Sequence, residues 1–70
     1  MTIAEFVKKR RREEGLNQRK LAELSGVGLR FVRELEQGKT TLQTHKVNAV
    51  LKLFGKKLGP VNLFEEEGDQ

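Results

Sequence analysis

The chain of 70 residues lacks cysteine, tryptophan and tyrosine, and it has one histidine and one proline. Without cysteine there are no disulfides and no thiolate metal sites, which fits a reducing compartment. His45 and the scattered acidic residues have no metal-ligand spacing, and no glycine-rich phosphate loop is present. These absences argue against an enzyme, and we expect no metal and no other cofactor.

Long apolar runs are also missing. No run approaches the roughly 20 residues of a membrane span, and no signal peptide opens the chain, so we expect no membrane partner and a cytoplasmic protein. Hydrophobic residues make up 36% of the chain and charged residues 34%. The length and composition predict one small domain with a limited core. Since disulfides and metals are absent as supports, we expect self-association to stabilise this core.

The charges are unevenly distributed. Residues 1–57 hold all 14 lysines and arginines and only six acidic residues, which gives this part a net charge of about +8. The remaining acidic residues lie in the last six positions and are Glu65, Glu66, Glu67 and Asp69. A basic body of this size indicates a polyanion partner without saying which one.

Residues 17–37, NQRKLAELSGVGLRFVRELEQ, contain two short helical patterns joined at Ser25-Gly26-Val27. In the first pattern Asn17 stands in the N-cap position, and the apolar residues at helical spacing are Leu21 and Leu24, with Ala22 beside them. The second pattern has an apolar side of Phe31, Val32 and Leu35. Its polar face, at i, i+3, i+4 and i+7, consists of Arg30, Arg33, Glu34 and Gln37.

The two helices have the residues that a close crossing needs. Ala22 stands where the second helix passes, and Gly26 at the turn permits a positive φ because it has no Cβ. Val32 and Leu35 fill the contact from the other side. This spacing is typical of a helix-turn-helix, whose second helix enters the DNA major groove. The alternative is a plain helical hairpin packed in a core, which leaves the two outward arginines unexplained.

Helices are also predicted on both sides of this unit. Thr2 and Glu5 form a capping-box pattern for a helix that runs to about Glu14 and stops at Gly15. Five successive basic residues, 8–12, point all round such a helix and cannot act as one patch. After residue 38 the loop Lys39-Thr40-Thr41 suits either phosphate contact or a solvated turn. Thr44 is the expected N-cap of a helix over residues 45–54, and its inner stripe is Val47, Val50, Leu51 and Phe54.

The C-terminal part differs from the helices. Its apolar residues are Leu58, Val61, Leu63 and Phe64, and Gly59-Pro60 excludes a helix. We read residues 58–63 as an extended segment that pairs with its copy across a two-fold axis, since one chain offers it no other strand. An irregular tail packed on the helices is the alternative. The expected organisation is therefore a domain over residues 1–64 and an acidic disordered tail over 65–70.

Several motifs together resemble the Xre/Cro-like helix-turn-helix family: Gly15-Leu16-Asn17-Gln18, Leu21-Ala22, Gly26-Val27 and Leu35-Glu36-Gln37-Gly38-Lys39. The run GVGLRFVRELEQGKTTLQ, followed by a helix and a short strand, resembles the HipB-like antitoxin-type regulators within that family. The resemblance implies a mainly α fold, a four- to five-helix Xre-type domain with a short C-terminal β-strand pairing across a homodimer. It also implies a palindromic operator, which often controls the regulator's own gene, and in some members a HipA-like kinase toxin as partner.

The resemblance also suggests roles for single residues. Gln18 would cap its helix and touch phosphate, whereas Leu29, Arg30, Arg33 and Glu34 would face bases. Glu34 would either accept from cytosine or hold a neighbouring arginine. Arg11 and Glu36 occupy the positions of a salt bridge between the first and third helices. Gly28 departs from the family pattern and loses a side-chain cap. The full predicted DNA-binding set is Gln18, Arg19, Gly28, Leu29, Arg30, Arg33, Glu34, Gln37, Lys39, Thr40 and Thr41, and the dimerisation set is Leu58, Val61, Leu63 and Phe64.

The sequence thus predicts a regulator, acting as a repressor or autoregulator, that binds double-stranded operator DNA as a homodimer and is associated with the nucleoid. The finer hypothesis is the antitoxin of a HipAB-like toxin–antitoxin pair. The alternative is a protein-binding antitoxin module that mainly neutralises a kinase-like toxin. RNA binding is disfavoured because no tyrosine or tryptophan is available to stack bases.

Overall fold

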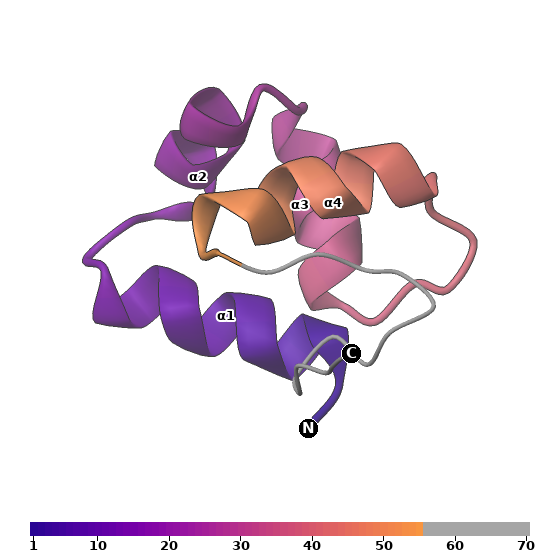
Figure 1. Ribbon diagram of the computed structural model, residues 1–70, viewed down its shortest axis with the longest axis horizontal. Helices are drawn as coiled ribbons and strands as arrows, with labels where there is room; N and C mark the ends of the chain where they lie inside the picture. The colour runs from indigo at the N-terminus through magenta and orange to yellow at the C-terminus, as the bar shows by residue number, and fades with distance from the viewer. Residues whose placement is uncertain (56–70) are drawn as a thin grey trace.

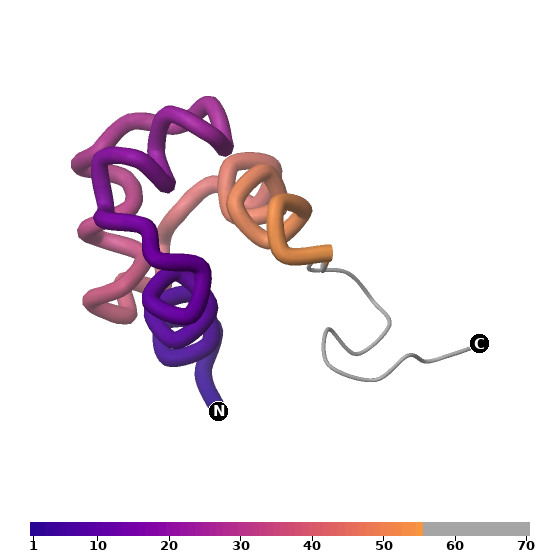
Figure 2. The backbone as a smooth tube through the Cα atoms, turned by 90° about the vertical axis from the view of Figure 1, so that its left-hand side faces the viewer, coloured from indigo at the N-terminus to yellow at the C-terminus, as the bar shows by residue number. Residues whose placement is uncertain are grey.

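The computed structural model describes residues 1–55, which form four helices and contain no strand. They are α1 (Ile3–Glu13), α2 (Gln18–Ser25), α3 (Leu29–Glu36) and α4 (Thr44–Leu53). In Figure 1, α1 lies along the bottom of the molecule, with α2 and α4 above it and α3 behind α4. Figure 2 shows α1 and α4 nearly end-on, with α2 and α3 toward the left. None of these helices is long and apolar enough to cross a membrane. The fold is mainly helical, as predicted.

The predicted start and end of α1 are confirmed. The hydroxyl of Thr2 accepts a hydrogen bond from the backbone N–H of Glu5 at 3.1 Å. The Glu5 carboxylate in turn accepts from the backbone N–H of Thr2 at 2.9 Å, which completes the capping box. After the last helical residue, Glu13, Gly15 adopts a left-handed conformation with φ of 72° and turns the chain toward α2.

The unit of α2 and α3 is defined by its caps and its turn. Asn17 Oδ1 accepts from the backbone N–H of Lys20 at 2.7 Å, so Asn17 caps α2. Gln18 does not cap this helix, contrary to the prediction, because it is already the first helical residue. Gly26, with φ of 78°, ends α2 and reverses the chain. Gly28 precedes α3 without a side-chain cap, as its missing side chain predicts.

The start of α4 corrects a second capping prediction. Gln43 is the N-cap and Thr44 is the first helical residue, so the boundary lies one position earlier than expected. The carbonyl of Gln43 accepts from the backbone N–H groups of Lys46 and Val47, both at 3.1 Å. No side-chain hydrogen bond caps this end, so the Thr44 hydroxyl does not set it.

One apolar core joins the four helices. Its buried members are Phe6, Val7, Leu21, Ala22, Val32, Leu35, Val47, Val50, Leu51 and Phe54. The predicted inner stripe of α4 and the crossing at Ala22 are therefore confirmed. Leu24 is different: its spacing from Leu21 suggests a second buried position, yet it is 51% exposed. Three residues are less than one full turn of a helix, so Leu24 points in a different direction from Leu21 and away from the core.

An aromatic contact closes α1 onto the end of α4. The rings of Phe6 and Phe54 lie 6.3 Å apart, edge to face, at 82°. The guanidinium of Arg10 lies over the ring of Phe54, 5.5 Å from its centre. These contacts position the end of α4. The predicted extended segment 58–63 and the acidic tail lie outside the described residues.

Candidate nucleic-acid interface

Helix α3 divides into a buried side and an outward side. Val32, Leu35 and Glu36 are buried and set the rotation of the helix. The outward side carries Arg30, whose side chain is 90% exposed, and Arg33, which is also exposed. Within residues 1–55, Arg33 has no ion pair, so its guanidinium is available for a base or a phosphate.

Glu34 also lies on this face, where its carboxylate oxygen Oε2 contacts two cations. It accepts from Nε of Arg30 at 3.3 Å and from Nζ of Lys39 at 3.4 Å. The Glu34 side chain is 24% exposed. Of the two roles that the sequence leaves open, holding a neighbouring arginine is the one seen in the structure. The second partner, Lys39, was not foreseen.

The loop after α3 returns its lysine to the helix. Gly38 adopts φ of 86°, and its N–H donates to the carbonyl of Leu35 at 3.1 Å. The N–H of Lys39 donates to the carbonyl of Glu34, also at 3.1 Å. This pair of bonds is a Schellman motif. It places Lys39, Thr40 and Thr41 in an exposed loop beside the end of α3.

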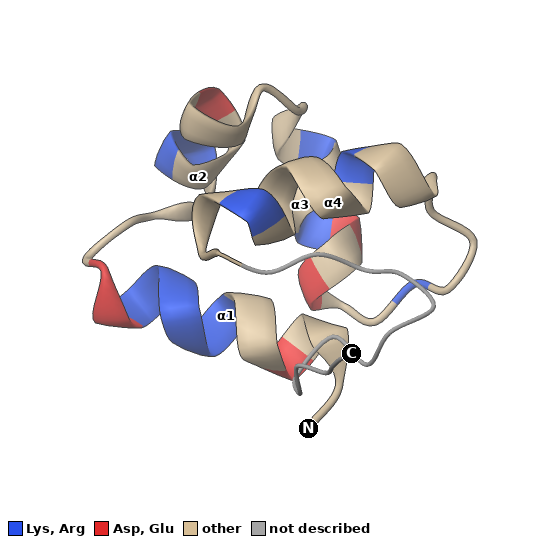
Figure 3. Ribbon diagram, viewed as in Figure 1, with Lys and Arg blue, Asp and Glu red and all other residues tan. Residues whose placement is uncertain are grey.

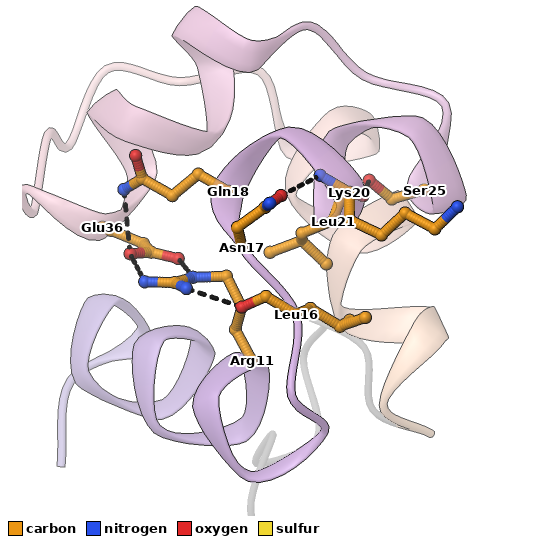
Figure 4. A network of polar contacts seen from close by, with 8 residues as sticks. All are labelled: Arg11, Leu16, Asn17, Gln18, Lys20, Leu21, Ser25 and Glu36. Carbon is orange, nitrogen blue, oxygen red and sulfur yellow. Dashed lines mark hydrogen bonds and ion pairs between the residues drawn. The ribbon is translucent and has the colours of Figure 1, made fainter.

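The first turn of α2 is tied to α3 through a buried carboxylate (Figure 4). Glu36 accepts from Nε of Arg11 at 2.6 Å and from its Nη2 at 3.0 Å. The side-chain amide of Gln18 donates to the same carboxylate at 3.1 Å. Arg11 also donates to the carbonyl of Leu16 at 2.8 Å. The salt bridge that the resemblance implies is therefore present, and Gln18 joins it.

Burial alone raises the pKa of Glu36, because a charged carboxylate loses its hydration. The hydrogen bonds from Arg11 and Gln18, with the positive charge of Arg11, outweigh burial and lower the pKa below the usual range of glutamate. Glu36 is thus ionised at neutral pH. The charged group fixes the angle between the start of α2 and the end of α3.

The remaining basic residues are spread over the four helices (Figure 3). On α1 the charge run is largely neutralised, since Lys9 and Arg10 both pair with Glu13 at 3.0 Å. Arg12 is exposed and forms no ion pair within residues 1–55. The same holds for Arg19 in the first turn of α2. Arg19 in α2, Arg30 and Arg33 in α3 and Lys39 in the following loop are therefore exposed cations of one helix-turn-helix unit, and the α1 run lies outside this unit.

Residues 7–61 match a family model described as helix-turn-helix. The chain belongs to this helix-turn-helix family. The domain is of the Xre-like type, in agreement with the motifs around α2 and α3.

Among curated proteins, the helix-turn-helix chain is similar to an uncharacterized HTH-type transcriptional regulator, y4mF, of Sinorhizobium fredii. The two are 47% identical over 53 residues, which cover 76% of this chain and 70% of the relative. No solved structure is significantly similar to the chain.

Two contacts of this helix-turn-helix domain were missed by sequence reasoning. The bond from Gln18 to Glu36 spans 18 residues and depends on how the helices cross, so no local pattern indicates it. The pair of Lys39 with Glu34 has a local signal, because a glycine after a helix returns the next residue to its last turn. The described residues contain no group of three or more metal-ligating side chains.

Proposed function

We propose that this helix-turn-helix protein is a sequence-specific, DNA-binding transcriptional regulator. The observation that supports it is the outward side of α3, where two exposed arginines lie on a helix whose rotation is fixed by buried neighbours. Arg30 and Arg33 are one helical turn apart and therefore project in the same direction. Either guanidinium fits the O6 and N7 atoms of guanine in a bidentate contact.

Other exposed groups of the same unit suit one further base contact and several phosphate contacts. Leu29 lies in the first turn of α3 and is only partly buried, so it can meet a thymine methyl group. Arg19 and the loop residues Lys39, Thr40 and Thr41 are the proposed phosphate partners, together with backbone N–H groups at the start of α2. Gln18 donates to Glu36 and would reach phosphate through its backbone N–H. The exposed Gln37 and the backbone of Gly28 complete the proposed interface.

The proposed regulator acts as a homodimer on a palindromic operator. One such domain is too small for tight specific binding, so two half-sites about one helical turn apart are required. Leu58, Val61, Leu63 and Phe64 are the proposed dimer contacts, and the extended pairing of residues 58–63 would set the spacing of the two α3 helices. A relative named as a transcriptional regulator supports the same role.

DNA selected from a random pool tests the proposal. Arg30→Ala or Arg33→Ala should weaken binding to the selected duplex by about 1–3 kcal/mol and change binding to random duplex little. Lys39→Ala should weaken both and flatten the salt dependence. Lys52→Ala removes the same charge from the last turn of α4 and serves as the matched control. If the protein enriches no DNA sequence from the random pool, sequence-specific binding is contradicted.

Sedimentation tests the dimer. The buried core described above lies within residues 1–55, so a chain ending at Gly55 retains it. This chain should sediment as a monomer or a weaker dimer, and it should lose far more affinity for a two-site operator than for a half-site. If it stays fully dimeric, the two-fold axis runs through the helices and not through residues 58–64.

The finer role we propose is the antitoxin of a HipAB-like pair, supported by the run from Gly26 to Gln43 and its resemblance to HipB-like regulators. The alternative is an antitoxin that mainly binds a HipA-like kinase toxin, with DNA binding secondary. Reading the open reading frame beside the gene distinguishes both antitoxin roles from a regulator that has no toxin partner. If it encodes a kinase-like protein, co-purification should give a complex, and operator affinity with and without that protein shows which role dominates.

A further inference from the structure

Three charged side chains lie next to one another at the outward side of α3: Arg30 and Glu34 on the helix and Lys39 in the loop that follows it. A single carboxylate oxygen of Glu34 contacts both cations, at 3.3 Å and 3.4 Å. Lys39 lies five residues after Glu34 and reaches it because the left-handed Gly38 reverses the chain. One anion therefore holds a cation from the helix and a cation from the loop.

The atoms used by Arg30 matter for recognition. The contact with Glu34 uses Nε, and no contact of the two terminal nitrogens occurs within residues 1–55. These Nη groups point into solvent on a side chain that is 90% exposed. Arg30 can therefore present both to a guanine while Nε stays on Glu34.

We propose that Glu34 is a positioning residue that increases discrimination between operator and random DNA. The proposal rests on the DNA-binding function proposed above. On an operator, Arg30 donates its terminal nitrogens to guanine and keeps Glu34 neutralised through Nε. On random DNA, Arg30 and Lys39 are both drawn to phosphates, but the attraction that Arg30 gains there is offset by the Glu34 charge that it leaves unpaired, so Arg30 adds little net affinity. The Glu34 carboxylate then faces a polyanion without a counter-charge, and the repulsion weakens this complex selectively.

Glu34→Gln removes the charge and keeps the shape of the side chain. We expect this variant to bind random duplex more tightly and with a steeper salt dependence, because the repulsion between the Glu34 carboxylate and the phosphates is removed while Arg30 and Lys39 keep their phosphate contacts. Affinity for the selected operator should stay unchanged or fall. The ratio of specific to random affinity should therefore drop about tenfold, which corresponds to about 1.4 kcal/mol.

The matched control is Glu23→Gln. Glu23 is an exposed residue of α2, 3.7 Å from Lys20, so its replacement removes the same charge without touching α3. It should change both affinities by the same factor and leave the ratio as in the wild type. If Glu34→Gln also changes both affinities equally, Glu34 contributes net charge only and the proposal is overturned.

A measurement on the wild-type chain makes the test independent of how the variant folds. The Nε–H resonance of Arg30 in a nitrogen-15 spectrum reports its bond to Glu34. This resonance should keep its position in the complex with the selected operator and shift in the complex with random duplex. Equal behaviour in the two complexes overturns the proposal.

The two proposals fail in different ways. A wild-type chain with no preference among DNA sequences overturns both the regulator function and the role of Glu34. A wild-type preference that survives Glu34→Gln unchanged overturns the role of Glu34 alone. Thermal melting of Glu34→Gln, expected within a few degrees of the wild type, establishes that the affinities are those of a folded protein.

Discussion

Arg11 and Glu36 lie 25 residues apart in the sequence and form a two-bonded ion pair between α1 and α3. Their side chains are only 11% and 2% exposed. Desolvating two charges costs free energy that their attraction offsets only when the geometry is good and other partners are satisfied. Leu16 and Gln18 supply those partners. The pair therefore fixes the arrangement of three helices more than it adds net stability.

The first prediction concerns removal of one partner. Arg11→Met or Glu36→Leu alone should lower the free energy of unfolding by about 3 kcal/mol, because the remaining charge stays buried without its partner. The double variant should lose less than either single variant. Urea unfolding of all four chains gives the coupling energy. Additive losses would mean that the two side chains do not interact in solution.

The second prediction concerns acid. Since folding lowers the pKa of Glu36 from about 4.5, ionised Glu36 stabilises the fold fully above the pKa of the unfolded chain. That contribution is lost as the pH falls from about 4.5 through the lower pKa of the folded state. In Glu36→Gln this loss should be missing, so the stability gap to the wild type should be widest at pH 7 and close below pH 4.5. Parallel unfolding curves from pH 7 downward would contradict it.

The third prediction compares two glycines two residues apart. A Cβ at Gly26 or Gly28 would meet no atom within 4 Å, so only backbone conformation distinguishes them. Gly26 has φ of 78°, and Gly26→Ser should destabilise the protein by about 1–2 kcal/mol. Gly28 has φ of −77° and lacks a side-chain cap, so Gly28→Ser should stabilise by about 0.5 kcal/mol. Thermal melts showing the same sign for both variants would refute this assignment.

The fourth prediction compares the confirmed cap of α2 with the corrected start of α4. Asn17→Ala removes a cap bond of 2.7 Å and should cost about 1 kcal/mol. Thr44→Ala replaces a residue inside α4 and should be neutral or slightly stabilising, since alanine favours helix more than threonine does. Chemical denaturation of both variants checks the pair. A comparable loss in Thr44→Ala would show that its hydroxyl caps α4 after all.

Local chemistry explains which features the sequence predicts. The capping box at Thr2, the cap at Asn17 and the left-handed turn at Gly26 depend on neighbours within a few residues, and all are confirmed. Features that depend on helix crossing are harder. The exposure of Leu24 and the bond from Gln18 to Glu36 follow from the rotation of α2 against its neighbours, which spacing alone does not determine.

The candidate site follows the same division. Helical periodicity places Arg30 and Arg33 on one outward face, and the structure agrees. The link from Glu34 to Lys39 requires the reversal at Gly38, so a helical wheel does not show it. Whether these residues contact DNA is a property of the complex, and it stays a prediction.

The contact of Phe6 with Phe54 also gives a proton NMR signal that reports whether α1 and α4 are in contact. All four aromatic residues apart from His45 are phenylalanines, so protons near their rings show ring-current shifts free of tryptophan or tyrosine contributions. An edge-to-face pair at 6.3 Å should move ring protons of one phenylalanine well upfield. The same signal should return to its random-coil position as soon as α4 separates from α1, so docking of these two helices can be followed in the unlabelled protein.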